Sequence, residues 1–230
     1  MKWLAWVLLV LAPMGASAQD TPAPDLNLKV QRQSTTIGRD GVQRESRYTD
    51  RVYRRSGMVW TERDFPAALG ASDTHGHEAR QQGEHAGHAH SSTVGSPVWV
   101  QQAADGKIEV RMVWRQQRKV LAIDEAHYGN VGYGGSWNVA YWLVDPGSLA
   151  RMEKAGPVSG GVQRYRLRQG ESSITVDWDV AAQYARQIES RGPHGLTVSR
   201  MTAVSVPAPK VLPWKAIEGY EQGDYSDLLD

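Results

Sequence analysis

The stretch that decides the fold is residues 27–62, NLKVQRQSTTIGRDGVQRESRYTDRVYRRSGMVWTE. It is rich in β-branched and aromatic residues, and two turn signals divide it, GRDG at 38–41 and Ser56-Gly57. Apolar and polar runs separated by such turns are typical of strands that follow one another in a meander. The pattern therefore predicts three consecutive antiparallel strands, at residues 27–37, 42–55 and 58–62.

Strand signals continue through the second half of the chain. The clearest alternation is at residues 107–117, where Ile108, Val110 and Met112 alternate with mostly polar neighbours. Further strands are predicted at residues 98–100, 120–123, 162–168, 173–178 and 196–206. The sum is eight to ten antiparallel strands with little helix, so we expect a mainly β protein (β-rich α+β) with a single antiparallel sheet.

Three segments are harder to assign. Residues 179–190 fit the period of a helix and that of a strand, and we favour a strand because tight turns join them to strands on both sides. Residues 139–144 are apolar and short, which leaves strand and helix both open. Residues 148–154 predict one or two helical turns with Ser148 as the N-cap.

The first eighteen residues, MKWLAWVLLVLAPMGASA, have the pattern of a secretory signal peptide. A basic residue precedes a short apolar run, and small residues end the segment, so we expect cleavage near Ala18. The run of about ten apolar residues is too short to cross a bilayer as a helix. We therefore expect a mature chain without a transmembrane segment, located in a periplasm or outside the cell.

Composition excludes several classes of protein. The chain has 230 residues and no cysteine, which excludes disulfides, iron–sulfur clusters and cysteine nucleophiles. Without Lys2 of the signal peptide, 25 of the 26 basic side chains remain against 25 acidic ones. A chain this close to neutral is not a polycation, so we expect no nucleic-acid partner.

Charge is nevertheless distributed unevenly along the chain. Residues 29–63 carry nine basic and four acidic side chains, whereas residues 215–230 carry one lysine and five acidic ones. Either these are two solvated faces, or the acidic tail docks on the basic strands or on a basic partner. We divide the chain into a signal peptide at 1–18, a β-rich domain at 19–206 and a Pro-rich linker with an acidic tail at 207–230.

A histidine-rich stretch interrupts the β-rich domain. Residues 66–97 contain few large apolar side chains and predict a long mobile loop. Imidazole suits Cu²⁺, Zn²⁺ and Ni²⁺, and two glutamates add oxygen ligands. The candidate metal ligands are His75, His77, Glu78, Glu84, His85, His88 and His90. The plainer alternative is a polar linker whose histidines only keep it soluble.

A second candidate site is the glycine- and aromatic-rich loop at residues 127–138, HYGNVGYGGSWN. Its aromatic side chains either pack over the mouth of the sheet or form a lip that binds a ligand; they are Tyr128, Tyr133 and Trp137. Neither a G-x-S-x-G elbow nor an H-E-x-x-H motif occurs in the chain. We therefore favour a binding protein over an enzyme.

The order of strands and turns resembles that of periplasmic lipoprotein-carrier (LolA-like) half-barrel proteins and their sensor relatives. The resemblance covers residues 27–206 and depends on the long first strands with their glycine turn, the mid-chain hairpin, and the closing hairpin from Trp178-Asp179 to IESRGPHGL at 188–196. It implies a sheet curved as a half-barrel or open barrel. It also implies that the concave face holds acyl chains or a segment of a partner protein.

Three functions remain open from the sequence. The first is a periplasmic or secreted binding protein that captures copper or zinc through the histidine-rich loop. The alternative is a half-barrel carrier or sensor that binds a lipid, a lipoprotein or another envelope protein on its concave face. The third is a periplasmic enzyme whose catalytic residues the sequence does not bring together.

Overall fold

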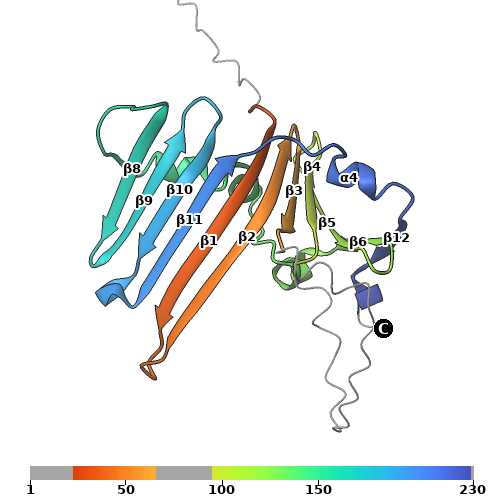
Figure 1. The fold of residues 1–230 in the computed structure, drawn as a ribbon, viewed down its shortest axis with the longest axis horizontal. Helices are drawn as coiled ribbons and strands as arrows, with labels where there is room; N and C mark the ends of the chain where they lie inside the picture. The colour runs from red at the N-terminus through yellow and green to blue at the C-terminus, as the bar shows by residue number, and fades with distance from the viewer. Residues whose placement is uncertain (1–22, 66–94, 229–230) are drawn as a thin grey trace, which may run out of the picture.

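The computed structural model describes residues 23–65 and 95–228, and these residues form one twelve-stranded sheet (Figure 1). The order across the sheet is β12-β6-β5-β4-β3-β2-β1-β11-β10-β9-β8-β7. The strands are β1 (Leu26–Ile37), β2 (Gln43–Arg55), β3 (Met58–Arg63), β4 (Val98–Gln102), β5 (Ile108–Trp114), β6 (Lys119–Ile123), β7 (Glu153–Lys154), β8 (Val162–Gln169), β9 (Ser172–Asp179), β10 (Tyr184–Arg191), β11 (Thr197–Ser205) and β12 (Glu221–Asp224). The mainly β fold and the single sheet predicted from the sequence are confirmed.

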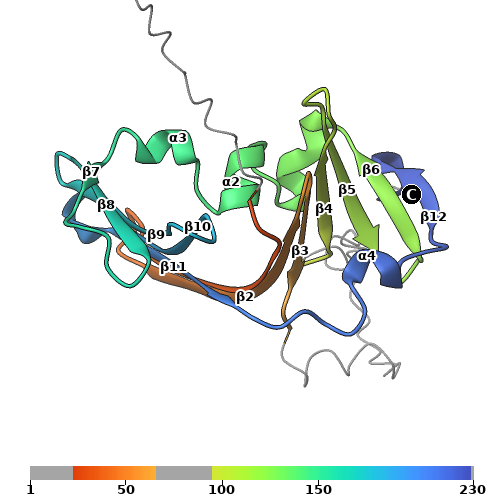
Figure 2. The same cartoon turned by 90° about the horizontal axis from the view of Figure 1, so that it is seen from above.

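The sheet is curved but open, since β12 and β7 form its two edges. Seen from above, it bends around a concave side that holds short helices (Figure 2). These helices are η2 (Glu125–Val131), α2 (Trp137–Trp142) and α3 (Pro146–Leu149). A curved open sheet with one covered face is the half-barrel form that the resemblance implied.

One pair of strands departs from the antiparallel expectation. β12 pairs with β6 in parallel, with Glu221 opposite Lys119 and Asp224 opposite Ala122. The reason lies in the path of the C-terminal segment, which crosses the convex face before it reaches the edge of β6. Short α4 (Pro213–Ala216) lies on that face, where Trp214 and Ile217 pack with Trp60.

After β12, the chain turns around the edge of the sheet to the concave side. There the last helical turn, η4 (Tyr225–Leu228), packs with Met112 and Leu121. The Lys119 ammonium donates to the Asp227 carboxylate at 2.7 Å, which ties this turn to β6. The described part of the acidic tail thus contacts β6 and the convex aromatic cluster.

The structure assigns the three segments that the sequence left uncertain. Residues 184–191 form strand β10, as favoured, and residues 180–183 form the turn before it. Residues 139–144 fall mostly in helix α2, whose N-cap Ser136 accepts from the Val139 amide. The prediction that Ser148 caps the next helix is wrong. Asp145 is the N-cap of α3 because its carboxylate accepts from the Gly147 amide, and Pro146 supplies the first helical φ.

The alternation of the strands sorts side chains onto two faces. On the concave face, Leu28, Val30 and Val52 are buried and pack against α2, α3 and the far strands. On the convex face, Tyr53 and Trp60 pack with the C-terminal segment. The helices therefore cover Leu28, Val30 and Val52 on the concave face, and the C-terminal segment covers Tyr53 and Trp60 on the convex face.

A buried arginine ties the concave cover to the sheet. The Arg54 side chain is 1% exposed, and its guanidinium donates to the carbonyls of four residues: Pro24, Tyr141, Ala182 and Gln183. It also lies 5.1 Å from the centroid of the Tyr141 ring. Burial lowers the pKa of Arg54, yet a guanidinium stays charged at neutral pH. Arg54 thereby joins the N-terminal segment, helix α2 and the β9–β10 turn.

Within residues 23–65 and 95–228, no helix is long and apolar enough to cross a membrane.

Candidate functional site: a cavity on the concave face

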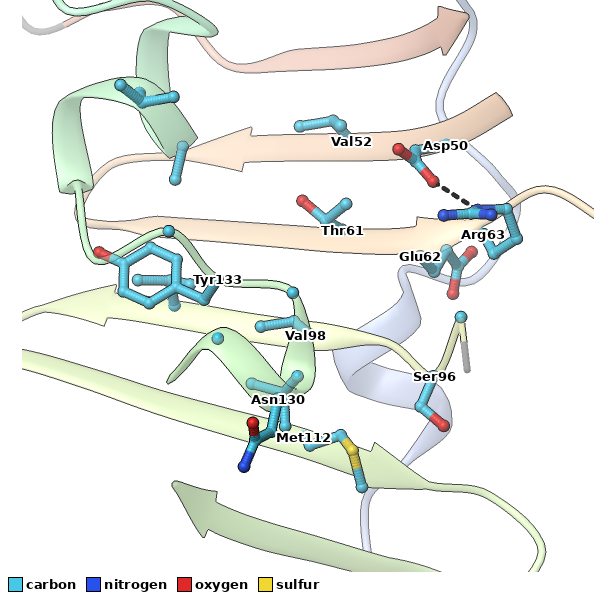
Figure 3. A pocket seen from close by; sticks show the side chains of 18 of the residues that line it. Asp50, Val52, Thr61, Glu62, Arg63, Ser96, Val98, Met112, Asn130 and Tyr133 are labelled. Atoms are coloured by element: carbon cyan, nitrogen blue, oxygen red, sulfur yellow. Dashed lines mark hydrogen bonds and ion pairs between the residues drawn. The ribbon is translucent and has the colours of Figure 1, made fainter. Parts of the chain in front are cut away.

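A cavity of about 930 Å³ lies between the concave face of strands β2 to β5 and the segment that covers it (Figure 3). The cover is the glycine-rich loop from η2 to α2, with Tyr225 and Leu228 of η4 beside it. The volume falls within the range of about 300–1,000 Å³ that is usual for small-molecule pockets. Helix α2 reaches from the core over β1 to the edge of the cavity, where its Val139 and Ala140 form part of the wall.

The floor and the cover are mostly apolar. Val52, Thr61, Val98 and Met112 point from four adjacent strands into the cavity (Figure 3). The opposing wall combines apolar Val131, Val139, Ala140 and Leu143 with polar Asn130 and Ser136. Alternation places these floor side chains on the concave face, so the strand pattern itself builds the apolar surface.

One end of the cavity is charged. The Arg63 guanidinium donates to the Asp50 carboxylate at 2.8 Å (Figure 3). The Arg32 guanidinium lies 3.5 Å from the other oxygen of Asp50. Arg63 also stacks over the Tyr48 ring, 4.0 Å from its centroid. Two guanidinium groups share one buried carboxylate here, which leaves a net positive charge at this mouth.

A second acidic residue at this end, Glu62, is hydrogen-bonded to residues outside the cavity. Glu62 follows Thr61 on β3, and its carboxylate accepts from the Arg115 guanidinium at 2.6 Å and from the indole nitrogen of Trp60 at 3.1 Å. Both partners hold this carboxylate by hydrogen bonds, and Arg115 balances its charge. The mouth therefore keeps its net positive charge despite a second carboxylate nearby.

Tyr133 lies at the end of the cavity away from Asp50 and Arg63 (Figure 3). Its side chain is 6% exposed, and its hydroxyl has no hydrogen-bond partner among the described residues. Burial raises the pKa of Tyr133, so the hydroxyl stays protonated at neutral pH and remains a donor.

The three aromatic residues proposed as a lip have different surroundings. Tyr128 and Tyr133 contact each other edge to face, with centroids 5.0 Å apart. Trp137 instead stacks on Tyr141 at 4.8 Å, inside the packing between α2 and the sheet. The structure thus brings two of the three together and places only Tyr133 against the cavity.

A second cleft, of about 720 Å³, lies on the other side of the same loop. It separates η2 from β5 and β6, and Tyr128 and Tyr133 line it together with Ile108 and Val110. Charged side chains surround it on several sides, namely Lys107, Glu109, Arg111, Asp124 and Glu125. Its lining is more mixed in charge than that of the concave cavity.

The C-terminal turn holds the covering loop in place. The His127 ring stacks on Tyr225 with centroids 3.9 Å apart, and the Asn130 side-chain amide donates to the Tyr225 hydroxyl at 2.8 Å. Because Tyr225 and Leu228 also line the cavity, the C-terminal segment forms part of its wall.

The metal ligands expected from the sequence all lie outside the described residues: His75, His77, Glu78, Glu84, His85, His88 and His90. In the part of the chain that the structure does describe, no group of three or more His, Asp or Glu side chains is placed to hold a metal ion. The prediction of a metal site in residues 66–97 therefore stays a prediction.

Sequence reasoning missed the charged mouth. Its signal was present, since Asp50 falls on the same face as Val52 and Arg54 when β2 is read with period two. An acidic residue on the buried face of a strand needs a cationic partner. Those partners, Arg32 and Arg63, come from the neighbouring strands β1 and β3, and their position beside Asp50 depends on the register of the three strands.

No protein-family model and no curated protein matches this chain. Several solved structures match it at low identity. An uncharacterized conserved protein from Thermus thermophilus is 9% identical over 86% of this chain and 90% of its own, with a TM-score of 0.41. A LolA superfamily protein from Nitrosomonas europaea is 8% identical over 82% and 88%, with a TM-score of 0.32.

A structure of PNGF-II is 9% identical over 88% of this chain, with a TM-score of 0.36, but this chain spans only 33% of the length of that protein. The matches include the LolA superfamily that the strand order resembles. At these identities the likeness concerns the fold alone.

Proposed function

We propose that this chain is a binding protein that holds an amphiphile, with an apolar chain in the concave cavity and an anionic head group at the charged mouth. The observation that carries the proposal is the arrangement of the cavity, which has apolar side chains on its strand floor and two guanidinium groups around one carboxylate at one end. Its ligand class is a lipid or the acyl part of a lipid-modified molecule. The signal-peptide pattern of residues 1–18 supports a periplasmic or extracellular location.

The apolar lining favours a hydrocarbon chain over a polar ligand. The floor offers Val52, Val98 and Met112, with a hydroxyl from Thr61 beside them. An acyl chain gains about 0.8 kcal/mol for each CH₂ group that it removes from water, so partial filling of the cavity is enough for micromolar binding. A sugar or peptide would leave most of its hydrogen bonds unmade against this surface.

The charged mouth favours an anionic head group. Asp50 occupies one side of each guanidinium of Arg32 and Arg63, and within residues 23–65 and 95–228 no other carboxylate pairs with either of them. Guanidinium groups bind carboxylate and phosphate oxygens with charge-assisted hydrogen bonds. Because Asp50 neutralises only one of the two guanidinium charges, a phosphate or carboxylate at this mouth would neutralise the other.

The experiment is a calorimetric titration with a lysophosphatidylglycerol of twelve to fourteen carbons, below its micellar concentration. We expect one site of micromolar affinity. Thr61→Phe fills the cavity floor and should weaken binding at least tenfold. Thr202→Phe makes the same change on the convex face of β11 and should leave binding unchanged. Equal binding by both variants would rule out the concave cavity as the site.

A second candidate function, capture of Cu²⁺, Zn²⁺ or Ni²⁺, is supported by five histidines within sixteen residues of residues 66–97. Its test is titration of the chain with each metal beside a variant that lacks residues 72–92. One metal bound at micromolar affinity by the whole chain alone would support the metal site. Equal weak binding by both would reject it.

A further inference from the structure

The hairpin of β1 and β2 extends well beyond β3 on one side, while β11 follows it almost to its end on the other (Figure 1). The two strands pair from Leu26 with Arg54 to Ile37 with Gln43, whereas pairing of β2 with β3 begins only at Asp50. Seven residues of β2 thus continue past β3, a length of about 20 Å at the usual rise per residue. We call residues 34–47 of this hairpin the arm.

The turn at the end of the arm is well ordered by hydrogen bonds. The Gly38 amide donates to the Val42 carbonyl at 3.0 Å, and the Val42 amide donates to the Asp40 carboxylate at 3.0 Å. The β10–β11 turn lies directly beside it, since the Ile37 amide donates to the Leu196 carbonyl at 2.8 Å. The end of the arm and the β10–β11 turn, residues 37–42 and 192–196, therefore lie side by side, and we call them together the tip.

Apolar side chains are exposed at the tip. Ile37 is 37% exposed, Val42 is 50% exposed and Leu196 is 45% exposed. All three come from the two adjacent turns, and strand alternation places Ile37 and Val42 on opposite faces of the hairpin. Aliphatic side chains exposed on both faces of a protruding turn are placed to enter an apolar phase end-on.

Unpaired cations flank these apolar residues. Arg39 and Arg191 are exposed and make no ion pair within residues 23–65 and 95–228. Arg44 pairs with Asp40, which neutralises that carboxylate, and Glu171 accepts from the His194 backbone amide at 3.1 Å. The tip thus combines exposed aliphatic side chains with free positive charge.

We propose that this tip docks on the surface of an anionic lipid bilayer. Ile37, Val42 and Leu196 enter the interface between head groups and acyl chains, and Arg39 and Arg191 contact the lipid phosphates. The occupant is a bilayer rather than a protein because aliphatic tips with flanking cations match both layers of a lipid surface, apolar below and anionic above. A flat protein partner would need a larger and continuous apolar area.

The position of the tip relates it to the cavity. Arg32 and Tyr48, which line the charged mouth, lie directly across from each other on the same hairpin. Ser34 and Ser46 are the next pair toward the tip on that face. Docking through the tip would therefore bring the mouth within about 20 Å of the bilayer surface. Bilayer docking does not require the cavity to bind lipid, so the two proposals stand separately.

The test is co-sedimentation with sucrose-loaded vesicles of the chain beginning at Gln19, which keeps every residue that the structure describes. One set is pure phosphatidylcholine and the other contains 30% phosphatidylglycerol. We expect binding to the anionic vesicles and at least tenfold weaker binding to the neutral ones. The triple variant Ile37→Ser, Val42→Ser and Leu196→Ser should bind the anionic vesicles about tenfold less well.

A matched control removes three equally exposed aliphatic side chains elsewhere: Val158→Ser, Val180→Ser and Val211→Ser. This control should bind vesicles like the unmodified chain. Loss of binding in both triple variants, or in neither, would overturn the proposal. The double variant Arg39→Gln and Arg191→Gln should bind anionic vesicles more weakly. Circular dichroism confirms that each variant is folded, and lysolipid titration reports the cavity independently of docking.

Discussion

Replacement of Arg54 by methionine should destabilise the fold strongly. The guanidinium makes five hydrogen bonds to four carbonyls at 2.6–3.3 Å, and no carboxylate is among its hydrogen-bond partners. Methionine fills similar space but leaves those carbonyls without donors. Each lost hydrogen bond to a charged group costs about 1.5–3 kcal/mol, offset by the cost of burying the cation, so we expect a loss of about 3–5 kcal/mol in unfolding free energy.

The assay is urea unfolding followed by tryptophan fluorescence, because Trp142 lies 5.2 Å from the Arg54 guanidinium and reports its surroundings. With an m-value of about 2 kcal/mol/M, the midpoint should fall by about 2 M. Arg54→Lys keeps the charge but has only three donors, so its urea midpoint should lie between those of Arg54→Met and the unmodified chain.

The matched control is Arg51→Met on the same strand. Arg51 forms an ion pair with Asp64, and its side chain is 47% exposed, so its loss should cost no more than about 1 kcal/mol. If Arg54→Met lies within about 1 kcal/mol of the unmodified chain, the carbonyl network does not hold the concave cover, and our account of the fold is wrong there.

Three other predictions address titration and charge. Burial raises the pKa of five tyrosines: Tyr53, Tyr128, Tyr133, Tyr141 and Tyr184. Their hydroxyls therefore ionise in the unfolded state before they ionise in the folded state, and the free energy of unfolding should fall as pH rises past about 10. Absorbance at 295 nm, which reports tyrosine ionisation, should show that these tyrosines ionise only at higher pH in the folded chain. The Lys119 ammonium lowers the pKa of Asp227, so its stabilising contact is present above about pH 4 and lost as pH falls further. Amide exchange in β12 should accelerate there before the rest of the sheet opens, and uniform acceleration would contradict this. Arg63→Gln should weaken binding of lysophosphatidylglycerol about tenfold and that of lysophosphatidylcholine much less, whereas an equal loss for both would argue against a head-group site.

Much of the fold was predictable because strand signals are local. Period two and the turns at residues 38–41 and 56–57 predict β1, β2 and β3, and the structure keeps them nearly unchanged. Strand β12 was not predictable in this way. Its four residues, Glu221–Asp224, have no β-branched or aromatic side chain, and they become a strand only because β6 offers an unpaired edge.

The candidate site was less predictable than the fold. The cavity depends on where α2 and α3 stop covering the sheet, which is a matter of tertiary packing. Its charged mouth needs Arg32, Asp50 and Arg63 from three strands in register. Tyr133 was named from the sequence as one of three aromatic residues that either pack over the sheet or form a ligand-binding lip, and it does line the cavity.

The most direct test of the central claim uses the methionine methyl groups as reporters. Met112 lies on the cavity floor, and Met58 lies on the convex face of β3, since it alternates with the buried concave Val59. The chain is labelled at its methionine methyl groups and titrated with a lysophosphatidylglycerol that carries a nitroxide on its acyl chain. Our account predicts that the Met112 signal broadens at one equivalent while the Met58 signal stays sharp. Equal broadening of both signals, or none at Met112, would contradict binding in the concave cavity.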